Sequence, residues 1–299
     1  MRLRDLLGTP WGSTALAATL ALGLAAPAGA QAPAPAPTAA PAPNPLPGAA
    51  PQAQEGAEAM AAHRAAYRLS LARSRPGGQV GQAEGAMLFE VRDACDGWTT
   101  RQRLGINVVD RAGDTVETSS DYSTWESKDG RRLRFTLTQS AQGAVMKRIT
   151  GEAELNGDQG GVVRYEQPEA QQLTLPPGTI LPMTHTIRAL AMAKAGQKML
   201  NVPLFDGTTD EGAQDTTTLF SAWTPPEANP RFPLLADQGS ARMRIAFFSR
   251  DASAGASTPE YEVGLRYFAN GVADDMKMDF GDFVLDGKLE KLEPLPHDC

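Results

Sequence analysis

Residues 261–280 read YEVGLRYFANGVADDMKMDF and contain two short segments in which apolar and polar side chains alternate. Successive side chains of an extended strand point to opposite faces, so the alternation places the apolar ones together on one face. Asn270-Gly271, between the segments, accepts the positive φ angles of a tight turn. The stretch therefore predicts a β-hairpin with one buried face. The residues expected on that face are Tyr261, Val263, Leu265, Tyr267, Met276, Met278 and Phe280.

The same alternation occurs at residues 67–71, 132–137 and 242–247. Strands that are joined by short turns must be antiparallel, and a long antiparallel meander curls or packs on itself to protect its edges. We therefore predict a mainly β fold, in which a long antiparallel sheet is curled into a β-spiral or open barrel. Further hairpin turns are expected at Asp129-Gly130, Asn156-Gly157 and Asp286-Gly287.

One segment has a helical period instead. In residues 182–195, PMTHTIRALAMAKA, the apolar residues Met183, Ile187, Leu190 and Ala191 fall on one helical face. Pro182 suits the first position of a helix, and the glycine that follows residue 195 suits its end. We predict one amphipathic helix here, packed against the curled sheet or plugging it.

The N-terminus has the form of a secretory signal peptide. Arg2 and Arg4 precede the uncharged residues 14–26, and Ala28-Gly29-Ala30 offers a small-residue cleavage site. The apolar stretch is shorter than the roughly 20 residues that a transmembrane helix needs. We expect cleavage after Ala30, export to the periplasm and no transmembrane anchor in the mature protein.

Residues 31–58 are rich in alanine and proline and contain no aromatic residue. Such a composition cannot bury enough apolar surface to fold, and alternating Ala-Pro favours an extended spacer. We interpret residues 1–30 as signal peptide, residues 31–58 as a disordered spacer and residues 59–299 as a single domain.

The chain has 299 residues, a net charge of −7 and only 6% aromatic residues. An acidic balance argues against a nucleic-acid partner, which usually requires a basic surface. The sequence contains no GxSxG, SxxK, HExxH, Walker A or strand-associated GxGxxG motif. We therefore predict no catalytic, cofactor-binding or metal site.

The remaining polar candidates have structural interpretations. His63, His185 and His297 are scattered, and His185 is expected to be a packed or surface histidine. An acidic cluster near the C-terminus lacks the order of an EF-hand loop, so we expect a solvated strand face rather than a calcium site. Its members are Asp274, Asp275, Asp279, Asp282 and Asp286.

The two cysteines are Cys95 and Cys299. Asp93 and Asp96 flank Cys95 and disfavour a reactive thiolate. Two free thiols would be unusual in an oxidising compartment, so we predict a structural Cys95–Cys299 disulfide.

Several separated motifs resemble the EipB-type cell-envelope-integrity family. The resemblance covers about residues 60–299, and the residues that carry it are His63-Arg64-Ala65, Tyr67, Leu69, Cys95-Asp96-Gly97-Trp98, Ser123-Thr124-Trp125-Glu126, Asp129-Gly130, Gly178-Thr179, Pro182, His185-Thr186, Asn270-Gly271-Val272, Phe280-Gly281-Asp282-Phe283, Gly287-Lys288-Leu289 and Cys299. The resemblance implies a periplasmic β-spiral similar to the lipoprotein-carrier fold, a Cys95–Cys299 disulfide, and a role in envelope integrity without established catalysis.

Two classes of function follow from these observations. The first is a non-enzymatic periplasmic protein that binds a hydrophobic ligand, such as a lipid or acyl chain, or an envelope protein partner. The alternative is an envelope hydrolase whose site the sequence does not reveal, and a deep polar cleft containing His185 would favour it. A structure that shows whether the interior of the sheet is filled or hollow separates these hypotheses best.

Overall fold

The computed structural model describes residues 53–250 and 258–296. The predicted signal peptide, residues 31–52 of the predicted spacer, His297 and Cys299 lie outside the described residues. The signal peptide and the disulfide therefore stay predictions.

Strands form more than half of the described chain, as the alternation predicts. They are β1 (His63–Ser74), β2 (Val80–Asp93), β3 (Gly97–Asp110), β4 (Thr115–Ser127), β5 (Arg132–Ala141), β6 (Ala144–Leu155), β7 (Gly161–Gln167), β8 (Gln171–Leu175), β9 (Met199–Leu204), β10 (Gln214–Phe220), β11 (Ser240–Phe248), β12 (Tyr261–Phe268), β13 (Ala273–Asp279) and β14 (Phe283–Pro294). The helical elements are α1 (Pro182–Lys194) and the 3₁₀ turns η2 (Ala57–Ala59), η3 (Gly157–Gln159) and η4 (Pro233–Leu235). Among the described residues, no helix is long and apolar enough to cross a bilayer.

All 14 strands belong to one antiparallel sheet with the order β8-β7-β6-β5-β4-β3-β2-β1-β14-β13-β12-β11-β10-β9. Consecutive strands pair with one another except for β8 and β9, and β14 returns to pair with β1. The two outermost strands are β8 and β9, which connect through α1. A parallel bridge pairs Ile180, in the segment between β8 and α1, with Leu204 at the end of β9, and the sheet does not close fully. The prediction of a long, curled, open sheet is confirmed.

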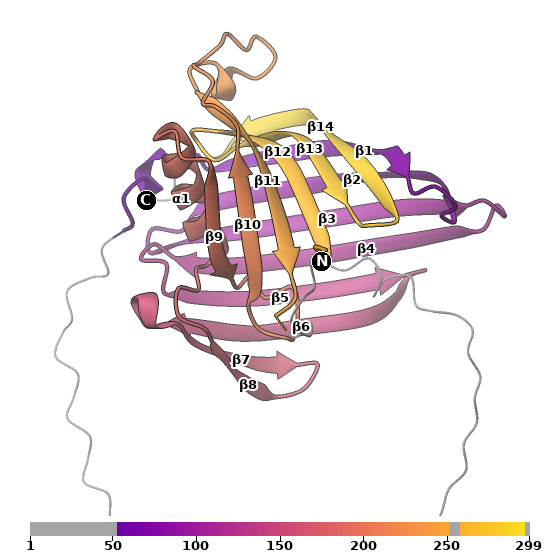
Figure 1. Cartoon of the computed structure of the whole chain (residues 1–299), viewed down its shortest axis with the longest axis horizontal. Helices are drawn as coiled ribbons and strands as arrows, with labels where there is room; N and C mark the ends of the chain where they lie inside the picture. The colour runs from indigo at the N-terminus through magenta and orange to yellow at the C-terminus, as the bar shows by residue number, and fades with distance from the viewer. Residues whose placement is uncertain (1–52, 251–257, 297–299) are drawn as a thin grey trace, which may run out of the picture. The chain divides into compact units, whose positions relative to one another are not determined.

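The curl produces two layers. Strands β9–β13 cross in front of β2–β6 at a steep angle, and α1 lies at one end of the crossing (Figure 1). The inward side chains form two separate hydrophobic clusters. The larger draws on β1–β3, α1 and β11–β14, whereas the smaller draws mainly on β5–β8 and includes Phe135, Tyr165 and Phe205. The space between the layers is therefore shared by two cores rather than one.

The helix begins at the predicted Pro182, but its buried face differs from the predicted one. Met183 is half-buried and Ala191 is exposed. The buried residues are His185, Ile187, Ala189, Leu190 and Ala193. The face is rotated because His185, a polar residue, takes an inward position beside the Thr218 hydroxyl of β10.

The turn predicted at Asp286-Gly287 is wrong. Both residues lie inside β14, and the chain reverses instead at residues 280–282, between β13 and β14. A Cβ atom at Gly287 would lie 3.1 Å from Met276 Cβ and 3.2 Å from Leu69 Cδ2. The glycine is thus explained by close packing between neighbouring strands. The other three predicted turn dipeptides connect consecutive strands.

Folded structure begins a few residues before the predicted domain start at residue 59. Ala57 is only 2% exposed, within the larger hydrophobic cluster. Gln54 donates a backbone hydrogen bond to the Lys128 carbonyl (3.0 Å) and a side-chain hydrogen bond to Thr184 Oγ1 (2.9 Å). The last residues of the expected spacer are therefore ordered, because specific hydrogen bonds and one small buried side chain hold them to the sheet.

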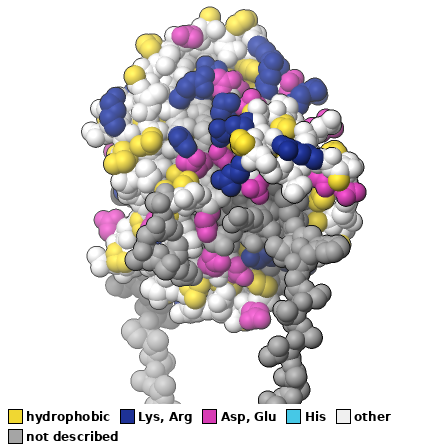
Figure 2. Space-filling model, turned by 45° about the vertical axis from the view of Figure 1, so that its right-hand side comes forward, with side chains coloured by type: hydrophobic (Ala, Val, Ile, Leu, Met, Phe, Trp, Pro, Cys, Tyr) yellow, Lys and Arg dark blue, Asp and Glu magenta, His cyan; other side chains and the backbone are white. Residues whose placement is uncertain are grey.

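The outer face of the sheet is polar and paired. Arginines and carboxylates on adjacent strands form ion pairs, such as Arg134–Glu152 (2.9 Å) and Arg242–Asp275 (2.8 Å). Figure 2 shows positive and negative side chains mixed over one face, with hydrophobic side chains scattered among them. The surface drawn there offers no large patch of one sign.

Candidate functional site

A cavity of about 280 Å³ lies between the two layers of the sheet. Its apolar wall comes from β1, β2, the end of β9, and β11–β13, with α1 contributing Met183 at one side. All the residues predicted to face inward in the 261–280 hairpin line this cavity, except Phe280. The side chains of the apolar wall are Tyr67, Met87, Phe89, Leu204, Ile245, Phe247, Tyr261, Val263, Leu265, Tyr267, Met276 and Met278.

The wall beside β2, on β3 and β4, is polar. It is formed by Thr100, Gln102, Ser120, Tyr122 and Thr124, which we call the polar wall. Gln102 lies opposite Tyr122, and Thr100 lies opposite Thr124, in the register of the two strands. The cavity is therefore amphipathic, because the inward positions of two adjacent strands carry hydrogen-bonding groups in place of aliphatic ones.

Ser120 differs from its neighbours. It is 4% exposed, and its Oγ has no hydrogen-bond partner among the described residues. Tyr122, one row further, donates its hydroxyl to the Asp206 carbonyl in the segment after β9. The Asp206 carboxylate accepts from the Thr208 amide (2.9 Å) and hydroxyl (2.8 Å), which fixes this segment at the rim of the cavity.

Glu126, at the end of β4, holds the start of α1. Its carboxylate accepts from the Met183 amide (2.7 Å), the Thr184 amide (2.9 Å) and the Thr184 hydroxyl (2.8 Å). These amides are among those that a helix N-terminus leaves unpaired, so the carboxylate caps the helix. Burial dominates over these bonds and raises the pKa of Glu126 to about 7. Glu126 therefore fixes α1 against the layer that carries the polar wall.

His185 also lines the cavity, where it is 4% exposed. Its Nε2 lies 2.9 Å from Thr218 Oγ1. Burial, with a smaller contribution from Arg188, lowers the pKa of His185 to about 4, so the ring is neutral near pH 7. No carboxylate within the described ranges hydrogen-bonds to this imidazole. A hydrolytic triad needs such a carboxylate to orient its base, and the prediction that His185 is a packed histidine fits its surroundings.

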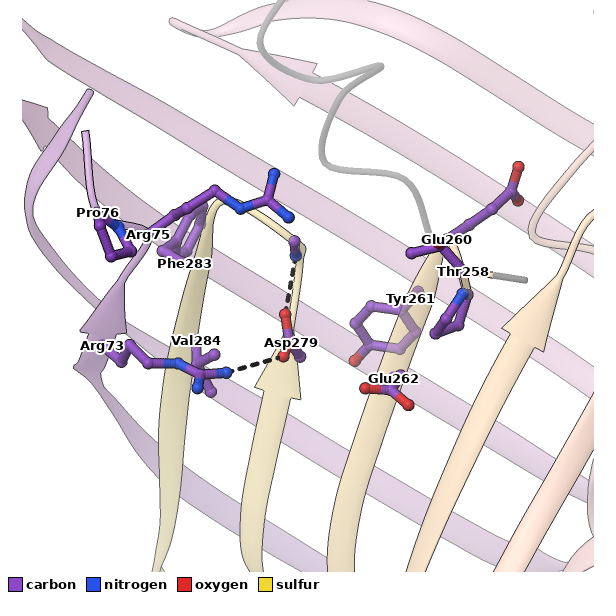
Figure 3. Close-up of a pocket in the computed structure, with 12 residues that line it drawn as sticks. Arg73, Arg75, Pro76, Thr258, Glu260, Tyr261, Glu262, Asp279, Phe283 and Val284 are labelled. Atoms are coloured by element: carbon purple, nitrogen blue, oxygen red, sulfur yellow. Dashed lines mark hydrogen bonds and ion pairs between the residues drawn. The ribbon is translucent and has the colours of Figure 1, made fainter. Parts of the chain in front are cut away.

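A second, shallower depression of about 330 Å³ lies over the ends of β12–β14 and β1. Figure 3 shows that Asp279 accepts from Arg73 and from the backbone of the β13–β14 turn, at 3.3 and 2.9 Å. Tyr261 lines both this depression and the interior cavity. Its ring packs against Phe247 and Phe280, with centroids 5.8 and 5.3 Å apart. Tyr261 thus separates the two spaces.

The acidic cluster occupies the outer face, as expected of a strand's wet side. Each member pairs with a cation: Asp274 with Arg266, Asp275 with Arg242, Asp279 with Arg73, Asp282 with Arg75 and Asp286 with Lys277.

Cys95 sits at positive φ in the turn between β2 and β3, where its amide donates to Asp93 Oδ1 (2.9 Å). His63 is buried in β1, and its Nδ1 donates to the Ala61 carbonyl (2.7 Å).

Sequence reasoning missed the polar wall and the Glu126 cap. Thr100, Gln102, Ser120 and Thr124 are ordinary strand-surface residues in a sequence, and only the register shows that they face inward. The signal that was present is the apolar-to-polar change along β3. On the inward face of β3, the polar residues Thr100 and Gln102 precede the apolar residues Leu104, Ile106 and Val108.

Comparisons with known proteins agree with this architecture. A family model described as EipB-like matches residues 54–296. The curated cell envelope integrity protein EipB of Brucella abortus (strain 2308) is 30% identical over 232 residues, which cover 76% of this chain and 81% of that protein. A crystal structure of a beta-barrel-like protein of the domain of unknown function DUF1849, from Brucella abortus, has a TM-score of 0.71 and 29% identity. It aligns with 79% of this chain and 99% of its own.

Proposed function

This chain belongs to the EipB-like family, and on that premise we propose that it supports cell-envelope integrity by holding a hydrophobic ligand between its sheet layers. The role in the envelope is supported by the name of the Brucella relative. The proposal includes a periplasmic location, which the predicted signal peptide supports, and binding without catalysis.

The observation that supports a bound ligand is the empty space beside the apolar wall. Protein cores normally pack as densely as organic crystals, and a space of about 280 Å³ among methionine, phenylalanine and tyrosine side chains departs from that rule. Small-ligand sites begin at about 300 Å³ and are mostly apolar. The size supports a single acyl chain rather than a complete lipid with several chains.

Methionine strengthens this interpretation. Met87, Met276 and Met278 lie on the apolar wall, and methionine is flexible enough to adapt to irregular or varied hydrophobic partners. The wall can therefore adjust to a flexible chain without a change in the sheet.

Calorimetric titration with single twelve-carbon chains tests the proposal. The panel contains 1-monododecanoylglycerol, dodecanamide, dodecanoate and dodecylamine, each below its aggregation concentration. We expect at least one chain to bind with 1:1 stoichiometry and a negative heat-capacity change, which marks burial of apolar surface.

Val263→Trp should abolish this binding by filling the cavity, since Val263 lines it between Ile245 and Met278 of the adjacent strands. Thr100→Phe fills the same space from the opposite layer, in case the first variant folds poorly. Val145→Trp is the matched control, because Val145 is 57% exposed. Absence of binding by all four chains, or binding that both cavity variants leave intact, would overturn the proposed function.

A protein partner in the envelope is the other form of this proposal. It predicts capture of a specific envelope protein even by the Val263→Trp variant. The hydrolase alternative finds no support in the cavity, where His185 is neutral and is hydrogen-bonded to Thr218 rather than to a carboxylate.

A further inference from the structure

The inward face of β3 changes character along its length. Leu104, Ile106 and Val108 are buried in the larger hydrophobic cluster, whereas Gln102 and Thr100 face the cavity. Polar groups placed inside a fold cost free energy unless they are hydrogen-bonded. A wall built only for packing would carry apolar residues here, as the neighbouring strand does at Val91, the partner of Thr100. The polar wall therefore needs an explanation other than stability.

Ser120 is the member of the polar wall whose hydroxyl lacks a hydrogen-bond partner among the described residues. Its position in the sheet lies between Leu104 on β3 and Gln139 on β5. The hydroxyl is buried without a partner among the described residues, and Ser120 is one of the residues that line the cavity. An unpaired buried hydroxyl destabilises the fold, and a hydrogen bond with an occupant would remove that penalty.

The charges around the cavity limit what that occupant can be. Among the described residues that line it there is no lysine or arginine. The one acidic side chain of the lining is Asp206, and Thr208 already bonds to its carboxylate. An anionic head would be buried without a counter-ion and beside a carboxylate, an arrangement that folded proteins avoid.

We propose that the cavity selects a hydrophobic chain with an uncharged polar head, such as an ester, amide or hydroxyl, and that the polar wall recognises this head through Ser120 and Gln102. The chain lies against the methionines and aromatic residues of the apolar wall, and the head faces β3 and β4. The inference rests on the proposed function, since it specifies the class of ligand for the same cavity.

The four-chain titration at pH 7.5 tests it, because the chains are equal in length and differ only in the head. We expect 1-monododecanoylglycerol and dodecanamide to bind at least ten-fold more tightly than dodecanoate, which finds no cation in the lining, or dodecylamine, whose ammonium would compete with Thr208 for the one carboxylate. Ser120→Ala should weaken binding of the two neutral chains about five-fold, the value of one hydrogen bond of about 1 kcal/mol.

Ser119→Ala is the matched control, because Ser119 is the exposed neighbour on the outer face of β4. Gln102→Leu is a second probe of the same wall and should reduce the neutral preference in the same direction. Equal affinities for neutral and charged heads, or equal effects of Ser120→Ala and Ser119→Ala, would overturn this inference and leave the proposed function standing. Failure of every chain to bind would overturn both.

Discussion

Two regions of one sheet use the same alternation and reach opposite results. In the filled cluster, formed mainly by β5–β8, the rings of Phe135, Tyr165 and Phe205 meet edge-on with centroids 5.4 to 6.4 Å apart. Around the cavity, the inward positions of β3 and β4 carry threonine, glutamine and serine, and space remains. Period-two alternation determines which side chains point inward. Their size and polarity decide whether the interior is filled.

The backbone at Gly207 also packs closely against the filled cluster. Gly207, at positive φ, lies so close to the filled cluster that a Cβ atom there would come within 2.4 Å of Phe135 Cγ. In the segment after β9, Gly207 therefore packs against the Phe135 ring, whereas its neighbours Asp206 and Thr208 line the cavity. One short segment connects the filled region to the hollow one.

Truncation of Phe135 should have the largest effect on stability. Phe135→Ala removes the central ring of a packed trio and should cost about 3–5 kcal/mol of unfolding free energy. Phe247→Ala, at the half-buried cavity wall, should cost less than half as much because that ring already borders empty space. Urea unfolding measures both variants, and equal losses would contradict the distinction between filled and hollow regions.

Two buried titratable groups at the N-terminal end of α1 also have opposite pH dependence. The pKa of Glu126 rises from 4.5 to about 7 on folding, so its stabilising contribution is complete below pH 4.5 and is lost as the pH rises to 7. The pKa of His185 falls from 6.5 to about 4, so its contribution is complete above pH 6.5 and is lost as the pH falls to 4. The two effects offset each other in the intact protein.

Single substitutions should reveal each slope. Glu126→Gln should leave a protein that loses about 3 kcal/mol of stability between pH 6.5 and 4, whereas His185→Gln should lose about 3 kcal/mol between pH 4.5 and 7. Urea unfolding at half-unit pH steps measures both. Identical pH profiles for the two variants would show that these groups do not titrate as their burial requires.

The predicted disulfide should matter next. Cys95 lies in the β2–β3 turn, where its amide donates to Asp93 Oδ1. If it pairs with Cys299, Cys95→Ser should cost about 2–4 kcal/mol. Non-reducing gels and thermal unfolding test this, and two reactive thiols in the exported protein would refute the pairing.

The smallest effect concerns Ser120 without a ligand. Ser120→Ala should raise the unfolding free energy by about 1 kcal/mol, because it removes a buried hydroxyl that has no partner. Ser119→Ala on the outer face should change it by less. A stabilised protein with weakened ligand binding would indicate that Ser120 is kept for binding. Destabilisation by Ser120→Ala would indicate a structural role instead.

The sequence allowed the curled sheet, the helix start and most inward residues of the 261–280 hairpin to be predicted, because alternation and turn chemistry are local. The same local reasoning wrongly predicted a turn at Asp286-Gly287. Only the neighbouring strands show that Gly287 is a strand residue that makes room for Leu69 and Met276. The Glu126 cap joins Glu126 to Met183 and Thr184, which lie 57 and 58 positions further along the chain. No local sequence pattern links residues so far apart. The polar wall depends on register between strands, which local alternation does not supply.

The most direct test of the central claim is a crystal structure of the protein grown with 1-monododecanoylglycerol. We predict one chain between the layers, in contact with Met87 and Met276, with its ester or a hydroxyl within hydrogen-bond distance of Ser120 Oγ. An interior filled by collapsed side chains, or a chain bound only on the outer face of the sheet, would contradict it.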